Sequence, residues 1–434
     1  MKKKILSIAI PAALGNLLDT LQLLIDMLMI GRLSPSAIAG VGLGGQLIIL
    51  IYSFISIFYV GTNVIVSRAY GEGNTEKAGK VISGLMVVAV IFSLPFLFFT
   101  VYHPDIFFQI MGAEKDVVRQ GHTYVSIIGL TMPFLFAGAV IHSAIVATGD
   151  TRTPLYISIF TNSLNTVLNY CLIFGNFGFP RLEVQGAAIA TSISYTIEVL
   201  IFLAVLITGR YGFRLSLKTS IEETIKALKI GIPAGLEKFI SFGSFLIFVK
   251  IVALYGTATL AGYQIGLRIE GIAFMPGFGF ATAAMVLTGQ YMGMKKTNLA
   301  EKSTIETLKI AMGFMGITGV LFIAFPEQLV SLFTDDRETI EKGALYLRIV
   351  GISQIPLAVE FVLNGALRGA GATRTTLLIN SLSFWAFRII PSYMATKLSD
   401  SIVPVYIIMT VETFIKAGIL WVVYKKGKWK KIKI

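Results

Sequence analysis

The stretch IAIPAALGN at residues 8–16 reappears as IGIPAGLEK at residues 230–238, and this repetition decides how the chain is organised. The two stretches are 222 positions apart (230 − 8 = 222), and the same shift relates Tyr124 to Tyr346. One register held over so long a distance indicates two copies of a single unit. We therefore predict two repeated halves, joined within residues 208–224.

Composition places both halves in a membrane. The chain is 55% hydrophobic and only 14% charged, with a mean hydropathy of +0.77, which is too apolar for a soluble protein of 434 residues. About 20 apolar residues in a helix span the hydrocarbon core of a bilayer. Glycine, proline and charged clusters divide the chain into twelve such spans, at 5–30, 38–67, 80–101, 122–147, 154–175, 185–207, 226–254, 259–288, 303–325, 343–367, 375–396 and 403–424. The predicted fold is an all-α membrane protein of twelve helices in two six-helix lobes.

The repeat and the charges predict the lobes and their orientation. The predicted parts are an N-lobe at 1–207, a linker at 208–224, a C-lobe at 225–424 and a basic tail at 425–434. Six spans return each copy to its starting side, so the repeat is parallel. One set of loops carries twenty-three Lys and Arg, with Arg214 and Lys218 of the linker among them, against seven on the other side. This bias predicts that both termini are cytoplasmic.

Several classes of protein are excluded. The net charge of +13 follows from the loop bias and the tail, so nucleic-acid binding is not needed to explain it. The single cysteine, Cys171, permits no internal disulfide, and the three histidines share no metal-ligand spacing. No GxSxG, HExxH or Walker motif occurs, so we expect neither an enzyme nor an ATP-driven pump.

Ionisable residues in the first span indicate a site. Asp19 and Asp26 lie about two helical turns apart with Gln22 between them, so the three form one polar stripe. Intramembrane acids are costly unless they face a polar interior, which predicts a cation or proton site at Asp26 beside a central cavity that Gln22 lines. The alternative is a structural hydrogen-bond seam between helices, and for Asp19 the two interpretations are evenly balanced.

The fifth span carries a second polar stripe. Asn162, Asn165 and Asn169 follow Ser158 at helical spacing. These amides either join neighbouring helices or support the Asp26 site as its neighbours or as cation ligands. Both stripes together predict a polar pocket within the first lobe.

The second lobe carries different charges. Glu237 stands where the first copy has Gly15, which favours a functional role over the alternative, pairing with a basic residue of the same lobe such as Lys250 or Arg268. We assign Gln264, Glu270 and Glu360 to the lining of the substrate cavity. Glu412 and Lys416, at i and i+4, are expected to be a neutralised pair inside the bundle, and Arg388 is expected to pack or to extend toward the interface.

Longer motifs resemble the multidrug and toxic compound extrusion (MATE) family of transporters. The run LLIDMLMIGRLSPSAIAGVGL around Asp26 is similar to the family's first-helix signature. VSRAYGEGN at 66–74 and LTGQYMGM at 287–294 resemble its paired loop motifs, as do ATGDTRTP at 147–154 and ALRGAGATRT at 366–375. LRIEGIAFMPGFGFATAA at 267–284 is similar to the bacterial DinF-like branch.

This resemblance implies an inner-membrane antiporter that exports cationic, lipophilic compounds in exchange for H⁺ or Na⁺. The family's N-lobe cation site falls on Asp26 and Asn165, with Thr191 beside them, while its second N-lobe aspartate falls at Asn169. Its C-lobe acid falls on Glu237. The partner aspartate that some members carry falls at Leu357, which weighs against a complete C-lobe Na⁺ site.

We therefore expect an alternating-access transporter in which a cation and a positively charged substrate compete. Besides its substrates it contacts membrane lipids, binds no nucleic acid, has no cofactor beyond the coupling ion, and is expected to be monomeric. The missing acids favour H⁺, and the alternative is Na⁺ bound by Asp26, Asn165 and Asn169. Two rival functions are a lipid or glycolipid flippase of the same superfamily and a channel or non-transporting membrane protein. The flippase would require a cavity richer in Lys and Arg than this chain offers.

Overall fold

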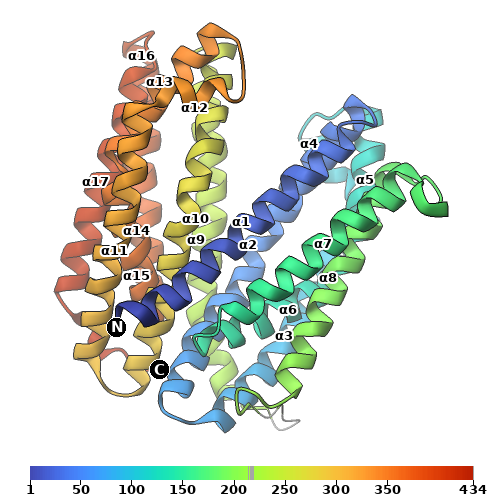
Figure 1. Cartoon of the computed structure of the whole chain (residues 1–434). Coiled ribbons are helices and arrows are strands. Elements are labelled where there is room, and N and C mark those ends of the chain that lie inside the picture. Colours follow the sequence, from blue (N-terminus) through green and yellow to red (C-terminus); the bar gives the residue numbers. More distant parts are fainter. Residues whose placement is uncertain (214, 216–218, 434) are drawn as a thin grey trace. The chain divides into compact units, whose positions relative to one another are not determined.

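The computed structural model describes residues 1–213, 215 and 219–433, and the regular elements in this part of the chain are helices (Figure 1). Arg214 and Lys218, which the charge count assigned to the cytoplasmic linker, lie outside the described residues. The helices are α1 Lys2–Ile30, α2 Pro35–Gly71, α3 Thr75–Tyr102, α4 Asp105–Ile110, α5 Lys115–Gly129, α6 Met132–Ala147, α7 Arg152–Phe174, η1 Asn176–Gly178, α8 Glu183–Ile207, α9 Ile221–Ala253, α10 Thr257–Gly293, α11 Thr297–Ala324, α12 Pro326–Ser331, α13 Arg337–Ile352, α14 Gln354–Gly369, α15 Thr373–Ser383, η2 Phe384–Ile389, α16 Ile390–Leu398, α17 Val403–Lys425 and η3 Lys428–Lys431.

The helix boundaries repeat with the same shift as the sequence. Adding 222 to both ends of α2 gives the ends of α10, because 35 + 222 = 257 and 71 + 222 = 293. The same addition converts α3 into α11 and α6 into α14. Both copies therefore fold into the same succession of helices, which confirms the predicted twelve-helix, two-lobe fold.

Most of these helices can cross a bilayer by length and composition. Eight described helices meet this criterion singly, while α5 with α6 and α13 with α14 meet it as pairs, which bend by 54° and 58° where they join. The predicted span 375–396 is the counterpart of 154–175 in the second copy. It is divided among α15, the π-helical η2 and α16, which follow one another without a gap. A single wider turn of this kind often marks a functional position in a helix.

Two compact units result, and they divide the chain inside two helices. One unit, here the N-unit, comprises Gly15–Gly235, and the other, the C-unit, comprises Met1–Leu14 and Leu236–Ile434. The boundaries thus fall within α1 and α9, whereas the lobes predicted from the repeat divide at the linker 208–224. The first half of α1 therefore belongs to the C-unit and the first half of α9 to the N-unit, whereas the sequence repeat assigns them to the first and the second copy respectively.

Local chemistry explains where helices begin and turn. Ser34 caps α2 by accepting a hydrogen bond from the Ala37 N–H at 3.1 Å, and Pro35 occupies the first helical position, where a missing N–H costs nothing. Gly149 and Gly371, which the repeat relates, have φ of +94° and +84°. This left-handed backbone suits glycine, and it places the loops after α6 and α14 in matching conformations.

Close packing within each unit also depends on glycine. A Cβ on Gly365 of α14 would collide with the backbone of Ala281 on α10, and one on Gly186 of α8 would collide with the backbone of Leu172 on α7. Small residues allow helix backbones to approach in this way inside membranes. The close approach packs α7, which carries the asparagine stripe, against α8 in the N-unit.

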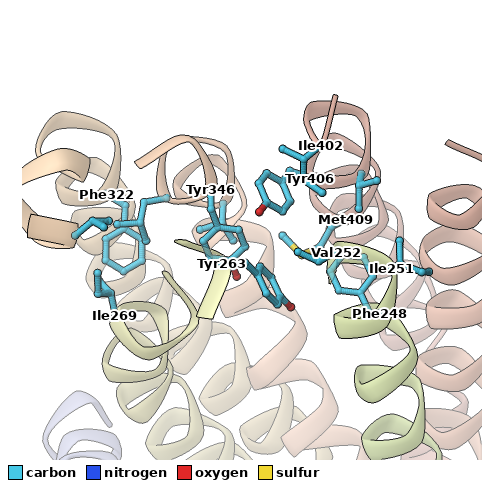
Figure 2. Close-up of a cluster of buried hydrophobic side chains, with 14 of the residues drawn as sticks. Phe248, Ile251, Val252, Tyr263, Ile269, Phe322, Tyr346, Ile402, Tyr406 and Met409 are labelled. Atoms are coloured by element: carbon cyan, nitrogen blue, oxygen red, sulfur yellow. The ribbon is translucent and has the colours of Figure 1, made fainter. Parts of the chain in front are cut away.

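The C-unit contains a cluster of buried hydrophobic side chains, drawn in Figure 2, in which aliphatic residues surround several aromatic rings. Tyr263, Tyr346 and Tyr406 are fully buried, and the rings of Tyr263 and Tyr346 meet edge to face at 5.1 Å. Tyrosine hydroxyls inside a core need polar partners. The hydroxyl of Tyr346 finds one in a buried glutamate, described below.

Candidate functional sites

Asp26 is surrounded by amide side chains in the N-unit. Gln22 lies one turn earlier on α1, and its Nε2 is 2.6 Å from Asp26 Oδ1. Asn169 of α7 reaches the same oxygen with its Nδ2, also at 2.6 Å. The structure therefore brings the two polar stripes together, as the sequence predicted.

Asn165 completes this amide cluster. Its Oδ1 lies 2.6 Å from Gln22 Nε2, and its Nδ2 lies 3.4 Å from Thr191 Oγ1. Turned over, the same amide donates to Asp26 Oδ1 at 3.1 Å and accepts from the Thr191 backbone N–H at 3.2 Å. Asn165 thus contacts the aspartate in one orientation and Thr191 in both.

The cluster leaves both a charge and an acceptor uncompensated. None of the ion pairs in the described part of the chain involves Asp26, and its partners are neutral amides. Asn169 is fully buried, yet its Oδ1 has no hydrogen-bond partner among the described residues. A half-buried carboxylate without a base, with an unused and fully buried amide oxygen beside it, suits a bound proton or a small cation.

Gln22 belongs to this network. It is buried, and its Oε1 accepts a hydrogen bond from the Thr166 hydroxyl at 3.0 Å. Both ends of the Gln22 amide are therefore occupied, and the residue holds Asp26 and Asn165 in register. Thr166 is a member of the site that sequence analysis did not identify.

Asp19 forms part of a separate group. Its Oδ1 accepts from Asn162 Nδ2 at 3.1 Å, two turns away from the Asp26 cluster. The carboxylate of Glu198 on α8 lies near enough to repel Asp19, and the hydroxyls of Tyr52 and Tyr195 bond to each other beside them. Glu198 was not among the predicted site residues, although an acid within the apolar span 185–207 is the same kind of signal as Asp26.

Glu237 is neutralised by a base that sequence analysis did not consider. Arg368 Nη2 lies 2.5 Å from Glu237 Oε1, so the partner is neither Lys250 nor Arg268. Asn380 Nδ2 donates to the same oxygen at 2.6 Å and Thr376 donates to Oε2 at 2.9 Å. Glu237 therefore has a full set of donors, and the pairing with a base of its own lobe that was the alternative to a functional role is present in the structure.

Glu412 and Lys416 are the neutralised pair that the sequence predicted, with Nζ and Oε1 3.1 Å apart. Two further charges join them. Glu360 accepts from Lys416 at 3.0 Å, and Arg388 donates to Glu412 Oε2 through Nη2 at 2.5 Å. Arg388 is thus part of a four-residue network with two acids and two bases, and Glu360 is bound within it.

The remaining residues assigned to the substrate cavity have different surroundings. Gln264 is exposed on α10. Glu270, two turns on, is buried and accepts hydrogen bonds from Tyr346 Oη at 2.5 Å and Gln354 Nε2 at 3.2 Å. Gln264, Glu270 and Glu360 thus have different surroundings within the C-unit, and Gln22 belongs to the N-unit.

Metal ligands are sparse. The described residues contain no group of three or more His, Cys, Asp and Glu side chains that could hold a metal ion. A Na⁺ ion at Asp26 would consequently depend on amide and hydroxyl oxygens from Asn165, Asn169 and Thr191. Cys171 is free and buried in α7.

Long apolar helices in two repeated sets, with carboxylates and amides held inside them, define a helical membrane transporter. Comparison with known proteins gives the family. The MatE family profile matches residues 11–171 and 233–394, which are the two copies of the repeat. The chain belongs to the MATE family, as its motifs predicted, and is a transporter and not an enzyme.

Two curated relatives cover nearly the whole chain. A probable multidrug resistance protein NorM of Thermotoga maritima is 30% identical over 439 residues, spanning 99% of this chain and 94% of the relative. A probable multidrug resistance protein YpnP of Bacillus subtilis is 27% identical, spanning 100% and 96%.

Solved structures share the fold. An outward-facing multidrug resistance MATE family transporter of the MOP superfamily superposes with a TM-score of 0.91 at 21% identity, covering 99% of this chain and 97% of the other. The Vibrio cholerae MATE transporter VcmN gives 0.92 at 22% identity, with 99% and 98% covered.

Proposed function

We propose that this protein is a secondary active antiporter that exports cationic, lipophilic compounds in exchange for H⁺. Its relatives carry the name of multidrug resistance proteins, which supports export of drug-like compounds. The distribution of basic residues supports a position in the cytoplasmic membrane with both termini inside. We expect a single chain to be sufficient, since each copy of the repeat supplies one lobe.

The observation that carries the proposal is the surroundings of Asp26. Its two close partners, Gln22 and Asn169, are amides, which can donate to a carboxylate or accept from a carboxylic acid. The site therefore accommodates Asp26 in either protonation state. An ion pair would instead hold the acid permanently ionised.

The substrate class follows from the sign of the charges in the N-unit. Asp19, Asp26 and Glu198 are acids within α1 and α8, and Tyr52 and Tyr195 stand beside two of them. Carboxylates attract a cation, and aromatic rings stabilise one that carries apolar groups. A lipophilic cation fits this combination, whereas a phosphate-bearing lipid would be repelled.

Competition between the proton and the substrate would couple their movements. If a protonated Asp26 and a bound cation each favour a different conformation of the transporter, binding of one promotes release of the other. The coupling is reciprocal, so a substrate that binds must lower the affinity for the proton by the same factor. Proton release on substrate binding is therefore the signature of the mechanism.

Efflux of a fluorescent lipophilic cation from proteoliposomes tests the proposal. Wild-type protein should export the dye when an inward proton gradient is imposed, and Asp26→Asn should abolish export while remaining folded, since it keeps shape and loses only the charge. Glu338→Gln is the matched control, because Glu338 is exposed at the start of α13. Export by the Asp26 variant at the wild-type rate would remove Asp26 from the coupling mechanism.

A further inference from the structure

Three glutamates of the C-unit are buried, Glu237, Glu270 and Glu412, and Glu360 is half-buried; all of these but Glu270 have a base within ion-pair distance. Glu237 contacts Arg368, Glu360 contacts Lys416, and Glu412 contacts two bases. Glu270 is the exception within the part of the chain that the structure describes. It is 3% exposed, and its two hydrogen bonds come from neutral groups.

Among the described residues, no base lies within ion-pair distance of Glu270. Tyr346 of α13 contacts it directly, and the rings of Tyr263 and Tyr406 pack against Tyr346. Arg388 of η2 attracts Glu270 through space, but this guanidinium already donates twice to Glu412. A buried carboxylate in this position is costly as long as it carries its charge.

Gln354 is suited to either protonation state of Glu270. Its Nε2 donates to the carboxylate at 3.2 Å, while its fully buried Oε1 has no hydrogen-bond partner among the described residues. If Glu270 takes up a proton, the amide can turn over and accept the new O–H through Oε1. The chemistry is that of Asp26 with Gln22 and Asn169, namely an acid held by amides.

Comparison of the two copies of the repeat shows that this acid and its amide are present only in the second copy. The positions that match Glu270 and Gln354 in the first copy are Ile48 and Met132 (270 − 222 = 48 and 354 − 222 = 132). The tyrosine is common to both copies, because Tyr346 matches Tyr124, which lies near Asp26. The tyrosine is therefore shared by the two copies, whereas the acid on α10 that it contacts is present in the second copy alone.

We propose that Glu270 is a second proton-binding carboxyl group, located in the C-unit, with Gln354 and Tyr346 as its positioning residues. Tyr346 donates to the carboxyl in both states, and the Gln354 amide reverses when the proton arrives. A proton fits better than a metal ion, because Glu270 is one acid among neutral groups and the described residues offer no cluster of three metal-binding side chains. The inference rests on the proposed proton coupling and extends it to two protons in each transport cycle.

Infrared spectroscopy detects the proton on Glu270 without requiring transport. In Na⁺-free liposomes, the wild-type protein should show carbonyl bands of protonated carboxyl groups that disappear as the pH is raised. Glu270→Gln should remove one of these bands, Asp26→Asn should remove another, and Glu338→Gln should leave both. Gln354→Met, which introduces the residue of the first copy, should shift the frequency of the Glu270 band. Spectra of Glu270→Gln and of Gln354→Met that match the wild type at every pH would overturn the proposal.

Proton release on binding of a lipophilic cation separates this inference from the proposed function. In a weakly buffered detergent solution with a pH indicator, Glu270→Gln and Asp26→Asn should each release about half as many protons as the wild type, and the double variant none. If Glu270→Gln matched the wild type while Asp26→Asn fell to zero, Glu270 would lose its role and the proposed function would stand. If the wild type itself released no proton, the proposed function would fail, and two-proton coupling with it.

Discussion

The four-residue charge network of the C-unit allows a quantitative prediction for Glu412→Gln. Glu412 is fully buried, and its carboxylate receives Arg388 Nε at 3.1 Å, Arg388 Nη2 at 2.5 Å and Lys416 Nζ at 3.1 Å. With Glu360 the network contains two negative and two positive groups, so it is neutral. The substitution leaves one buried positive charge without compensation. Breaking a buried ion pair in this way costs about 3–5 kcal/mol, and we expect the free energy of unfolding to fall by that amount.

A second substitution distinguishes lost charge balance from lost packing. Adding Lys416→Met to Glu412→Gln restores neutrality with a side chain of similar length, so the double variant should recover most of the lost stability. The assay is unfolding of the purified protein in mixed micelles, followed by tryptophan fluorescence, with Glu338→Gln as the control. A Glu412→Gln variant as stable as the wild type would refute the reasoning, and so would a double variant less stable than the single one.

Three further predictions concern other parts of the chain. Asp19→Asn should lower dye export less than Asp26→Asn does in the same proteoliposomes, because Asp19 is bonded to Asn162 outside the amide cluster; equal loss would contradict this. A reporter fused after Gly149 should be cytoplasmic and one within 104–120 external, with the same result 222 residues further on; opposite orientations of the two halves would mean an inverted repeat. Burial raises the pKa of Asp150, but hydrogen bonds from Thr153 and Tyr211 outweigh burial and hold this pKa below its ordinary value. The stability that the Asp150 carboxylate contributes is therefore fully present at a pH above the ordinary pKa, and it is lost as the pH falls through the lowered pKa. Hydrogen-exchange protection at 208–213 should therefore decrease at acid pH, and Asp150→Asn should show the decrease at neutral pH; unchanged protection in the variant would argue against this tether.

The sequence was sufficient to predict those features that follow from a regular spacing of residues, namely the internal repeat and the polar faces of single helices. The constant shift of 222 anticipated the matching ends of α2 and α10, because both copies carry the same apolar runs and caps. Helical spacing likewise placed Asp26 with Gln22, and Asn165 with Asn169, on single faces. The contact between the polar faces of α1 and α7 could also be predicted, because exposing carboxylate and amide side chains to lipid is unfavourable in free energy.

Contacts between distant segments could not be predicted in the same way. Arg368 and Glu237 are 131 positions apart, and no spacing rule selects Arg368 over other bases. Gln354 begins a helix after a bend, where its direction depends on how α13 and α14 meet. The exchange of the first halves of α1 and α9 between units depends on tertiary packing, which a repeat in sequence does not encode.

The most direct test of the account is to ask which gradient drives export through Asp26. Proteoliposomes containing the wild type or Asp26→Asn are loaded with a lipophilic cation, and efflux is measured under an imposed pH gradient in Na⁺-free buffer and under an imposed Na⁺ gradient at fixed pH. The account predicts that the wild type exports the cation under the pH gradient alone and that the variant exports it under neither. Export by the wild type only under the Na⁺ gradient would contradict proton coupling and would identify Asp26, Asn165 and Asn169 as Na⁺ ligands.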